Sequence, residues 1–131
     1  MMLGFVLCLA LFATTGGCDD TERSSYQKGL ALMQAKDYSG AEAKFDYSLS
    51  KNPDSKSALY RKAYCIYKQG KHAEALPLFE DFLGKTDNNE WTATFIDERR
   101  DAQFFRDKCK LALGQEVPQD PNNIPEPPMG E

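Results

Sequence analysis

The chain has 131 residues, of which 27% are charged, and its formal net charge is −4. This length fits one domain of ordinary size and excludes barrel enzymes and doubly wound dinucleotide-binding folds, which need longer chains. The charges are unevenly spread: residues 1–17 carry none, residues 115–131 carry four acidic residues and no basic one, and residues 18–114 are balanced. A balanced domain lacks the basic excess that phosphate binding requires, so we expect no nucleic-acid partner.

Residues 1–17 predict an export signal. The apolar run from Leu3 to Ala13 has the length of a signal-peptide core and is too short to span a bilayer as a helix. Small residues follow this run and lead directly to Cys18. Small side chains before a cleavage point let an extended chain enter a peptidase cleft.

Small residues followed by Cys18 resemble the lipobox of bacterial lipoproteins. In that family the cysteine is acylated and becomes the first residue of the mature chain. The resemblance implies a membrane anchor at Cys18 with more than one acyl chain, and a place in the bacterial cell envelope facing the periplasm or the outside. Two features depart from the pattern: Thr15 replaces a large aliphatic residue, and no Lys or Arg precedes the apolar core. A cleaved signal with an incidental cysteine is the alternative.

A 34-residue repeat organises the middle of the chain. When residues 24–51 are shifted forward by 34, small residues fall on small ones and large apolar residues on large ones. The matching pairs include Tyr26 with Tyr60, Gly29 with Ala63, Leu32 with Ile66, Ala41 with Ala75, Phe45 with Phe79 and Leu49 with Leu83. Within each copy the apolar residues recur at steps of three and four, which predicts two antiparallel helices per copy.

A third helical segment follows the two copies, over about residues 90–113. Its apolar residues recur mostly at helical steps and are Trp91, Phe95, Ala102, Phe105, Cys109 and Ala112. Two repeats leave an apolar face uncovered, so this segment is expected to cap them. The pattern is interrupted at Arg99-Arg100, where we expect a break in the helix and a solvated basic patch. A contact for a carboxylate is the alternative role of this pair.

The repeat resembles the tetratricopeptide repeat. The features that carry the resemblance are the 34-residue period, small residues where the helices cross, a late aromatic residue and a closing Pro53. It implies an all-α fold: a short α-solenoid of two helix hairpins plus a C-terminal capping helix, about five helices after the signal peptide. The expected organisation is a signal peptide over 1–17, a repeat domain over 18–114 with repeats at about 22–55 and 56–89, and a Pro-rich acidic tail over 115–131 that is extended or disordered.

One helix carries a second apolar face. Tyr60, Tyr64 and Tyr67 lie at steps of four and three, offset by one residue from the face that packs on the partner helix. In tetratricopeptide domains this face of the first helices lines a concave peptide-binding surface. The resemblance implies a peptide-binding groove formed by Tyr26, Leu30, Met33, Gln34, Tyr60, Tyr64, Tyr67 and Lys68. Two alternatives remain open: the capping helix packs on Tyr64 and Tyr67, or the tail fills the groove.

The sequence offers little for catalysis or metal binding. The single histidine, His72, lies where a helix starts and has no ligand-type neighbour at metal-binding spacing. No acidic residue lies within an apolar stripe, so a wall-degrading hydrolase has no support. We therefore expect no enzyme, no cofactor and no metal. Cys65 and Cys109 could pair in an oxidising compartment, or they could be two small side chains packed on helices.

Together these features predict a membrane-anchored tetratricopeptide lipoprotein. It would act as a scaffold that binds an unidentified envelope protein or peptide during assembly of an envelope complex. The alternative is a soluble periplasmic carrier that holds a small apolar ligand between its helices.

Overall fold

The computed structural model describes residues 21–117. The predicted export signal, Cys18 and all but the first three residues of the predicted tail lie outside this range.

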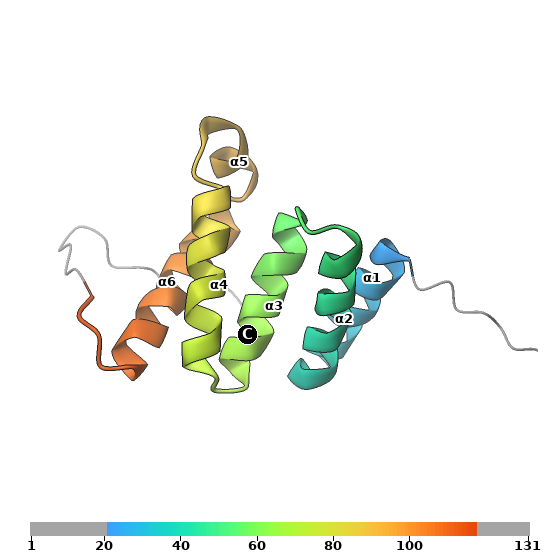
Figure 1. Ribbon diagram of the computed structural model, residues 1–131, viewed down its shortest axis with the longest axis horizontal. Coiled ribbons are helices and arrows are strands. Elements are labelled where there is room, and N and C mark those ends of the chain that lie inside the picture. Colours follow the sequence, from blue (N-terminus) through green and yellow to red (C-terminus); the bar gives the residue numbers. More distant parts are fainter. Residues whose placement is uncertain (1–20, 118–131) are drawn as a thin grey trace, which may run out of the picture.

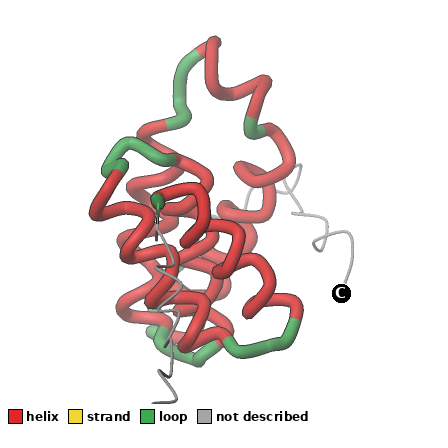
Figure 2. Tube along the Cα trace, turned by 90° about the vertical axis from the view of Figure 1, so that its right-hand side faces the viewer, coloured by secondary structure: helices red, strands yellow, loops and turns green. Residues whose placement is uncertain are grey.

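The described part of the chain is built of helices alone, which confirms the all-α solenoid expected from the sequence. Figure 1 shows them following one another along the long axis, with α1 at one end and α6 at the other. Figure 2 shows that no strand occurs within residues 21–117. The helices are α1 (Glu22–Gln34), α2 (Tyr38–Lys51), α3 (Lys56–Lys68), α4 (His72–Lys85), α5 (Asn89–Thr94) and α6 (Ile96–Ala112).

The first three helices begin at short polar side chains that cap their free backbone amides. Thr21 accepts a hydrogen bond from the amide of Ser24, Asp37 from that of Gly40, and Ser55 from that of Ala58. These residue types hold a helix start because their oxygen replaces the missing carbonyl partner. The cap residue of α4, Lys71, makes no such bond, and packing alone fixes that start.

Helices α1, α3 and α6 end in the same backbone turn. The turn residue has a positive φ in each case: 61° at Lys36, 78° at Gly70 and 70° at Gly114. After each of them the next amide donates back to a carbonyl inside the helix, for example Lys71 to Ile66 and Gln115 to Lys110. This bond satisfies a carbonyl at the helix end and reverses the chain. Residues of the three helices can therefore be compared by the number of positions that separate them from the turn residue.

The two hairpins have separate apolar clusters. In the first, Phe45 lies between α1 and α2 and is fully buried with Ala41 and with Cys65 of α3. In the second, Phe79 and Phe82 of α4 are fully buried and belong to a larger cluster that includes α3 and α6. Burial of such aromatic side chains supplies most of the stabilisation available to a helical repeat.

The capping segment consists of two helices rather than one. The break falls at Phe95, four residues before the expected position at Arg99, and separates the six-residue α5 from α6. Helix α5 projects beyond the stack (Figure 1). Helix α6 packs mainly on α4 and to a lesser extent on α3, so it closes the array as a cap.

The outward side of α6 explains why the array stops there. Measured from the turn residue, Leu59, Ala63 and Ile66 of α3 correspond to Gln103, Asp107 and Lys110 of α6. The three residues of α3 pack on the second helix of their hairpin, whereas the three of α6 are polar. A polar outer face is what a terminal repeat needs for solubility.

Candidate functional site

The common turn defines an equivalent strip of residues on α1, α3 and α6. These residues lie ten, six and three positions before the turn residue, so each set of three shares one helix face. We call the nine residues the first-helix strip: Tyr26, Leu30 and Met33 on α1, Tyr60, Tyr64 and Tyr67 on α3, and Phe104, Lys108 and Leu111 on α6.

The α1 part of the strip is half-buried. Tyr26 lies edge-on to Phe45, with ring centroids 5.5 Å apart, and Leu30 and Met33 pack on the same cluster. Each of the three strip residues therefore has one side in the first hairpin and keeps part of its surface in solvent. Gln34, at the end of α1, is exposed.

The sequence prediction for Tyr60 is wrong. This residue is 4% exposed, and its ring lies 5.3 Å from that of Phe82 and 6.4 Å from that of Phe79. It belongs to the core of the second hairpin, because Phe79 and Phe82 of α4 cover its ring, and the spacing of the tyrosines alone does not show this.

Tyr64 and Tyr67 follow the alternative in which the capping helix packs on them. Their ring centroids lie 5.3 and 4.8 Å from that of Phe105 on α6, and both residues are half-buried. Tyr64 also meets Tyr38 of α2 edge-on at 6.2 Å. The two tyrosines thus join α3 to the cap and show only part of their rings to solvent.

A carboxyl group lies beside the buried end of the strip. Asp101 of α6 accepts a hydrogen bond from the Tyr60 hydroxyl, and its other oxygen, Oδ1, is buried without a hydrogen-bond partner in the described structure. Desolvation raises the pKa of Asp101 above its usual range, and neighbouring Asp97 and Glu98 add to this effect. Desolvation and the charge of Asp101 in turn raise the pKa of Tyr60. No sequence pattern indicates a role for this acid, because its position relative to Tyr60 depends on how α6 packs on α3.

Two cations lie over aromatic rings at the strip: Lys68 borders it on α3, and Lys108 belongs to it on α6. The Lys68 ammonium lies 5.7 Å from the ring centroid of Tyr64 and 6.0 Å from that of Tyr38. The ammonium of Lys108, an exposed residue of α6, lies 5.3 Å from the ring centroid of Phe104. A cation over an aromatic face is stabilised while it keeps solvent contact. The strip therefore pairs rings with positive charge at α3 and α6.

The α6 members of the strip were not predicted from the sequence. Phe104 is half-buried, and Leu111 is 57% exposed. A signal was available: a shift of 44 residues carries Ala58 to Ala102 and Cys65 to Cys109, and all four of these residues are fully buried against the preceding helix. The inserted α5 hides this correspondence from a search at a period of 34.

The cysteines and the histidine serve packing. Cys65 and Cys109 are free thiols in the two different apolar clusters. Burial raises the pKa of the Cys65 thiol to about 12 and that of Cys109 to about 11, which keeps both protonated and unreactive near neutral pH. His72 starts α4 as expected; its ring packs on Tyr67, and Nδ1 lies 3.9 Å from the Cys109 sulfur.

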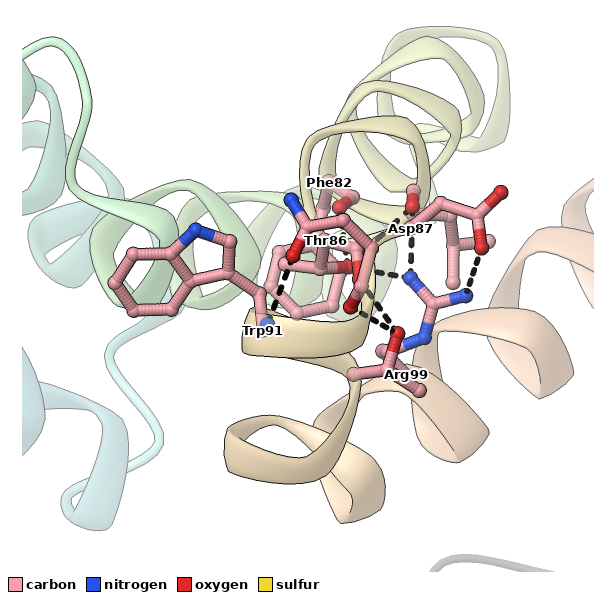
Figure 3. A network of polar contacts seen from close by, with 8 residues as sticks. Phe82, Thr86, Asp87, Trp91 and Arg99 are labelled. Atoms are coloured by element: carbon pink, nitrogen blue, oxygen red, sulfur yellow. Dashed lines mark hydrogen bonds and ion pairs between the residues drawn. The ribbon is translucent and has the colours of Figure 1, made fainter.

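Arg99 corrects the expectation of a solvated basic patch. Its side chain is 14% exposed and reaches back from α6 to the end of α4 (Figure 3). Nη1 donates to the Leu83 carbonyl at 2.8 Å and to Thr86 Oγ1 at 2.7 Å, and Nη2 lies 3.3 Å from a carboxylate oxygen of Asp87. Arg99 therefore fixes the junction that directs the chain into α5. Arg100, in contrast, pairs with Asp97 at 3.0 Å near the surface.

The junction also holds α5 in place. Thr86 is fully buried and its hydroxyl donates to the Phe82 carbonyl, while the Trp91 amide is capped by Asn88 (Figure 3). The Lys56 ammonium lies 4.3 Å from the ring centroid of Trp91, which connects α5 to the start of α3.

Two broader features concern residues 21–117 only. None of their helices combines the length and the apolar character needed to cross a bilayer. They also contain no group of three or more His, Cys, Asp or Glu side chains placed to hold a metal ion.

Comparison with known proteins identifies the repeat. The family model described as the tetratricopeptide repeat matches residues 26–90, from α1 to the start of α5. No curated protein and no solved structure matches the chain significantly. The paired helices and the 34-residue correspondence between Phe45 and Phe79 agree with this match, so residues 26–90 are similar to tetratricopeptide repeats, which suggest a protein–protein interaction module.

Proposed function

We propose that this protein is a lipid-anchored interaction module of the bacterial cell envelope that binds a peptide or partner protein along its first-helix strip. The proposal combines the repeat fold with the export signal and Cys18 that the sequence predicts. The tether would keep the repeats at a membrane surface, where they would hold a partner during assembly of an envelope complex.

The half-exposed strip residues of α1 and α3 carry the proposal. Leu30, Met33 and Tyr64 are packed firmly enough to be rigid and still keep surface in solvent. Rigid aromatic and aliphatic side chains bind at low cost in conformational entropy, and a tyrosine ring adds a polar tip. Gln34 and Lys68 extend this surface with polar groups. Tyr60 has no part in it.

Site-directed photo-crosslinking tests the surface. A photo-reactive residue at the exposed Gln34 is expected to trap one specific envelope protein, whereas the same residue at Lys51, on the outer helix α2, is expected to trap none. Adding Leu30→Glu or Lys68→Glu should abolish the Gln34 adduct because each places an unfavourable charge on the strip. Equal labelling from Gln34 and Lys51, or an adduct that survives both changes, contradicts the proposed surface.

The anchor is tested separately. Cys18→Ser is expected to release the full chain from the membrane fraction without detergent, because the proposed acyl chains would be missing. Unchanged membrane attachment of this variant removes the lipid from the proposal and leaves the binding surface untouched.

A further inference from the structure

The α6 end of the first-helix strip leaves apolar surface exposed in the described structure. Leu111 is 57% exposed, and Phe104, on the same face of α6, is half-buried. Leu113, directly after the helix, is 40% exposed. The residue of α3 that corresponds to Leu111 is Tyr67, which is covered by Phe105 of the next first helix. No further helix follows α6 within residues 21–117, so its own strip lacks that cover.

The turn at the end of α6 starts a hairpin that the sequence cannot complete. In both repeats a second helix begins two residues after the turn residue, at Tyr38 and at His72. The equivalent position is Glu116, and the residues that follow include Pro118, Pro121, Pro125, Pro127 and Pro128. Prolines at this density exclude a regular second helix.

The chain itself leaves the structure at this surface. The Gln115 amide bonds back to Lys110, and Val117, the last described residue, is half-buried. A further 14 residues follow, which span up to about 45 Å when extended, against about 25 Å for the length of α6. Every part of the α6 and α3 strip is therefore within reach of residues 118–131.

The composition of this segment matches the surface. Residues 118–131 contain Asp120, Glu126 and Glu131 with no basic residue, and they carry two large apolar side chains, Ile124 and Met129. The surface offers the converse: Lys108 stands over the ring of Phe104 on the helix that carries the exposed Leu111, and Lys68 stands over the ring of Tyr64 on α3. A proline-rich segment also loses little conformational entropy on docking.

We propose that residues 118–131 dock on the α6 end of the first-helix strip of their own chain. Ile124 or Met129 covers Phe104 and Leu111, and the acidic side chains pair with Lys108 and Lys68. Because the segment is tethered next to its site, its effective concentration is in the millimolar range and a weak intrinsic affinity suffices. One consequence rests on the proposed function: a partner peptide that binds the α1 and α3 part of the strip would have to displace residues 118–131 from its α6 end.

Methyl NMR of the full chain in detergent tests the docking. The Ile124 methyl resonances are expected to differ from those of a free peptide of residues 115–131 and to show contacts with Phe104 or Leu111. Lys68→Glu combined with Lys108→Glu should shift them towards the free-peptide values, with a docking constant about tenfold lower because two attractions become repulsions. The matched control, Lys51→Glu with Lys85→Glu on the second helices, should leave them unchanged.

A second variant tests the docking without any change in the repeats, so misfolding of the repeats cannot explain its effect. Asp120→Asn, Glu126→Gln and Ile124→Ser alter only the segment, and together they should move the Lys108 and Leu111 amide resonances to the values of a chain that stops after Val117. The proposal is overturned if the Ile124 methyl resonances of the unaltered chain match those of the free peptide. It is also overturned if the contacts of Ile124 persist after both the lysine changes and the changes within residues 118–131. Shifts that grow with protein concentration also overturn it, because they indicate docking on a second copy. None of these readouts involves the partner, so docking and the proposed function can fail independently.

Discussion

The two hairpins use the same backbone plan with side chains of very different size. At positions separated by 34 residues, the first hairpin has Ser25 and Ser48 where the second has Leu59 and Phe82, and all four residues are buried. The Ser48 hydroxyl donates to a Glu22 carboxylate oxygen at 3.1 Å, whereas Phe82 packs on Tyr60 and on Phe95 of the capping segment.

The difference follows from position in the array. The second hairpin has neighbours on both sides, and its large residues reach both the first hairpin and the cap. The first hairpin has a described neighbour on one side only, and its helices approach closely across Gly29. The interior repeat thus holds most of the aromatic core, and we expect changes there to cost more than equivalent changes in the first hairpin.

The largest effect is expected for the pair of equivalent phenylalanines. Phe79→Ala should lower the free energy of unfolding by about 3–5 kcal/mol, because the fully buried ring contacts those of Tyr60, Tyr67 and Phe105. Phe45→Ala should cost less, since its one described ring partner is the half-buried Tyr26. Urea unfolding of the two variants measures the difference, and equal losses would remove the proposed asymmetry.

The next largest loss of stability is expected at Arg99, which joins α6 to the end of α4. Arg99→Ala should cost about 1–3 kcal/mol, because the Leu83 carbonyl and the buried Thr86 hydroxyl lose their charged donor. The matched control is Arg100→Ala, which removes an exposed ion pair and should change stability by less than about 0.5 kcal/mol. Thermal unfolding followed by circular dichroism distinguishes them. Similar losses in both variants contradict the structural role of Arg99.

A methyl group added at the helix crossing tests how closely the first hairpin packs. An added Cβ at Gly29 would lie 2.8 Å from two ring carbons of the fully buried Phe45. We expect Gly29→Ala to destabilise the protein by about 1 kcal/mol, because overpacking exceeds the gain in helix propensity. Gly84→Ala, with no atom within 4 Å of its added Cβ, should instead stabilise by up to about 1 kcal/mol. A gain in both variants means that the crossing can relax.

A smaller effect separates the two buried serines. Ser25 Oγ is buried with no hydrogen-bond partner in the described structure, so Ser25→Ala should stabilise the protein by about 1 kcal/mol. Ser48→Ala removes the bond to Glu22 and should be about 1 kcal/mol less favourable than Ser25→Ala. Since both changes have the same intrinsic helix preference, the difference between their urea midpoints reports the hydrogen bond.

The smallest effect is a pH dependence at the cap. Because the pKa of Asp101 is raised above its unfolded value of 3.8, the folded protein holds this proton to higher pH than the unfolded chain does. Stability from this group is therefore full below pH 3.8 and falls as the pH rises through the folded pKa. Asp101→Asn removes that fall, so the variant should be the more stable protein at neutral pH and show no advantage near pH 3. An advantage of the same size at both pH values would contradict the shift.

Much of this fold could be predicted from the sequence because it depends on local periodicity. The 34-residue repeat placed Ala41 and Phe45 in the first core and Ala75 and Phe79 in the second, and all four are fully buried. Small residues and turn signals bounded the helices for the same local reason.

The site could be predicted only in part because exposure depends on distant packing. Tyr60, Tyr64 and Tyr67 have the same spacing as a binding stripe, yet Phe82 and Phe105 cover them to different degrees. Arg99 was expected to be a solvated surface residue. No sequence signal shows that α6 packs where its side chain can donate to the Leu83 carbonyl at the end of α4. Because α5 is inserted before α6, the 34-residue period does not extend to α6. The period therefore could not predict that α6 covers the tyrosines or that Arg99 contacts Leu83.

The polar outer side of α6 has a consequence for assembly. Helical arrays of this type can grow when the last helix offers an apolar ridge to the first helix of another molecule. Gln103, Asp107 and Lys110 give no such ridge, and Lys110 is already engaged with Glu80 at 3.1 Å. End-to-end stacking through this helix would bury two ion pairs, Lys110 with Glu80 and Arg106 with Asp107, and such burial carries a desolvation cost. Within residues 21–117, this face of α6 therefore offers no apolar ridge on which the first helix of a further repeat could pack.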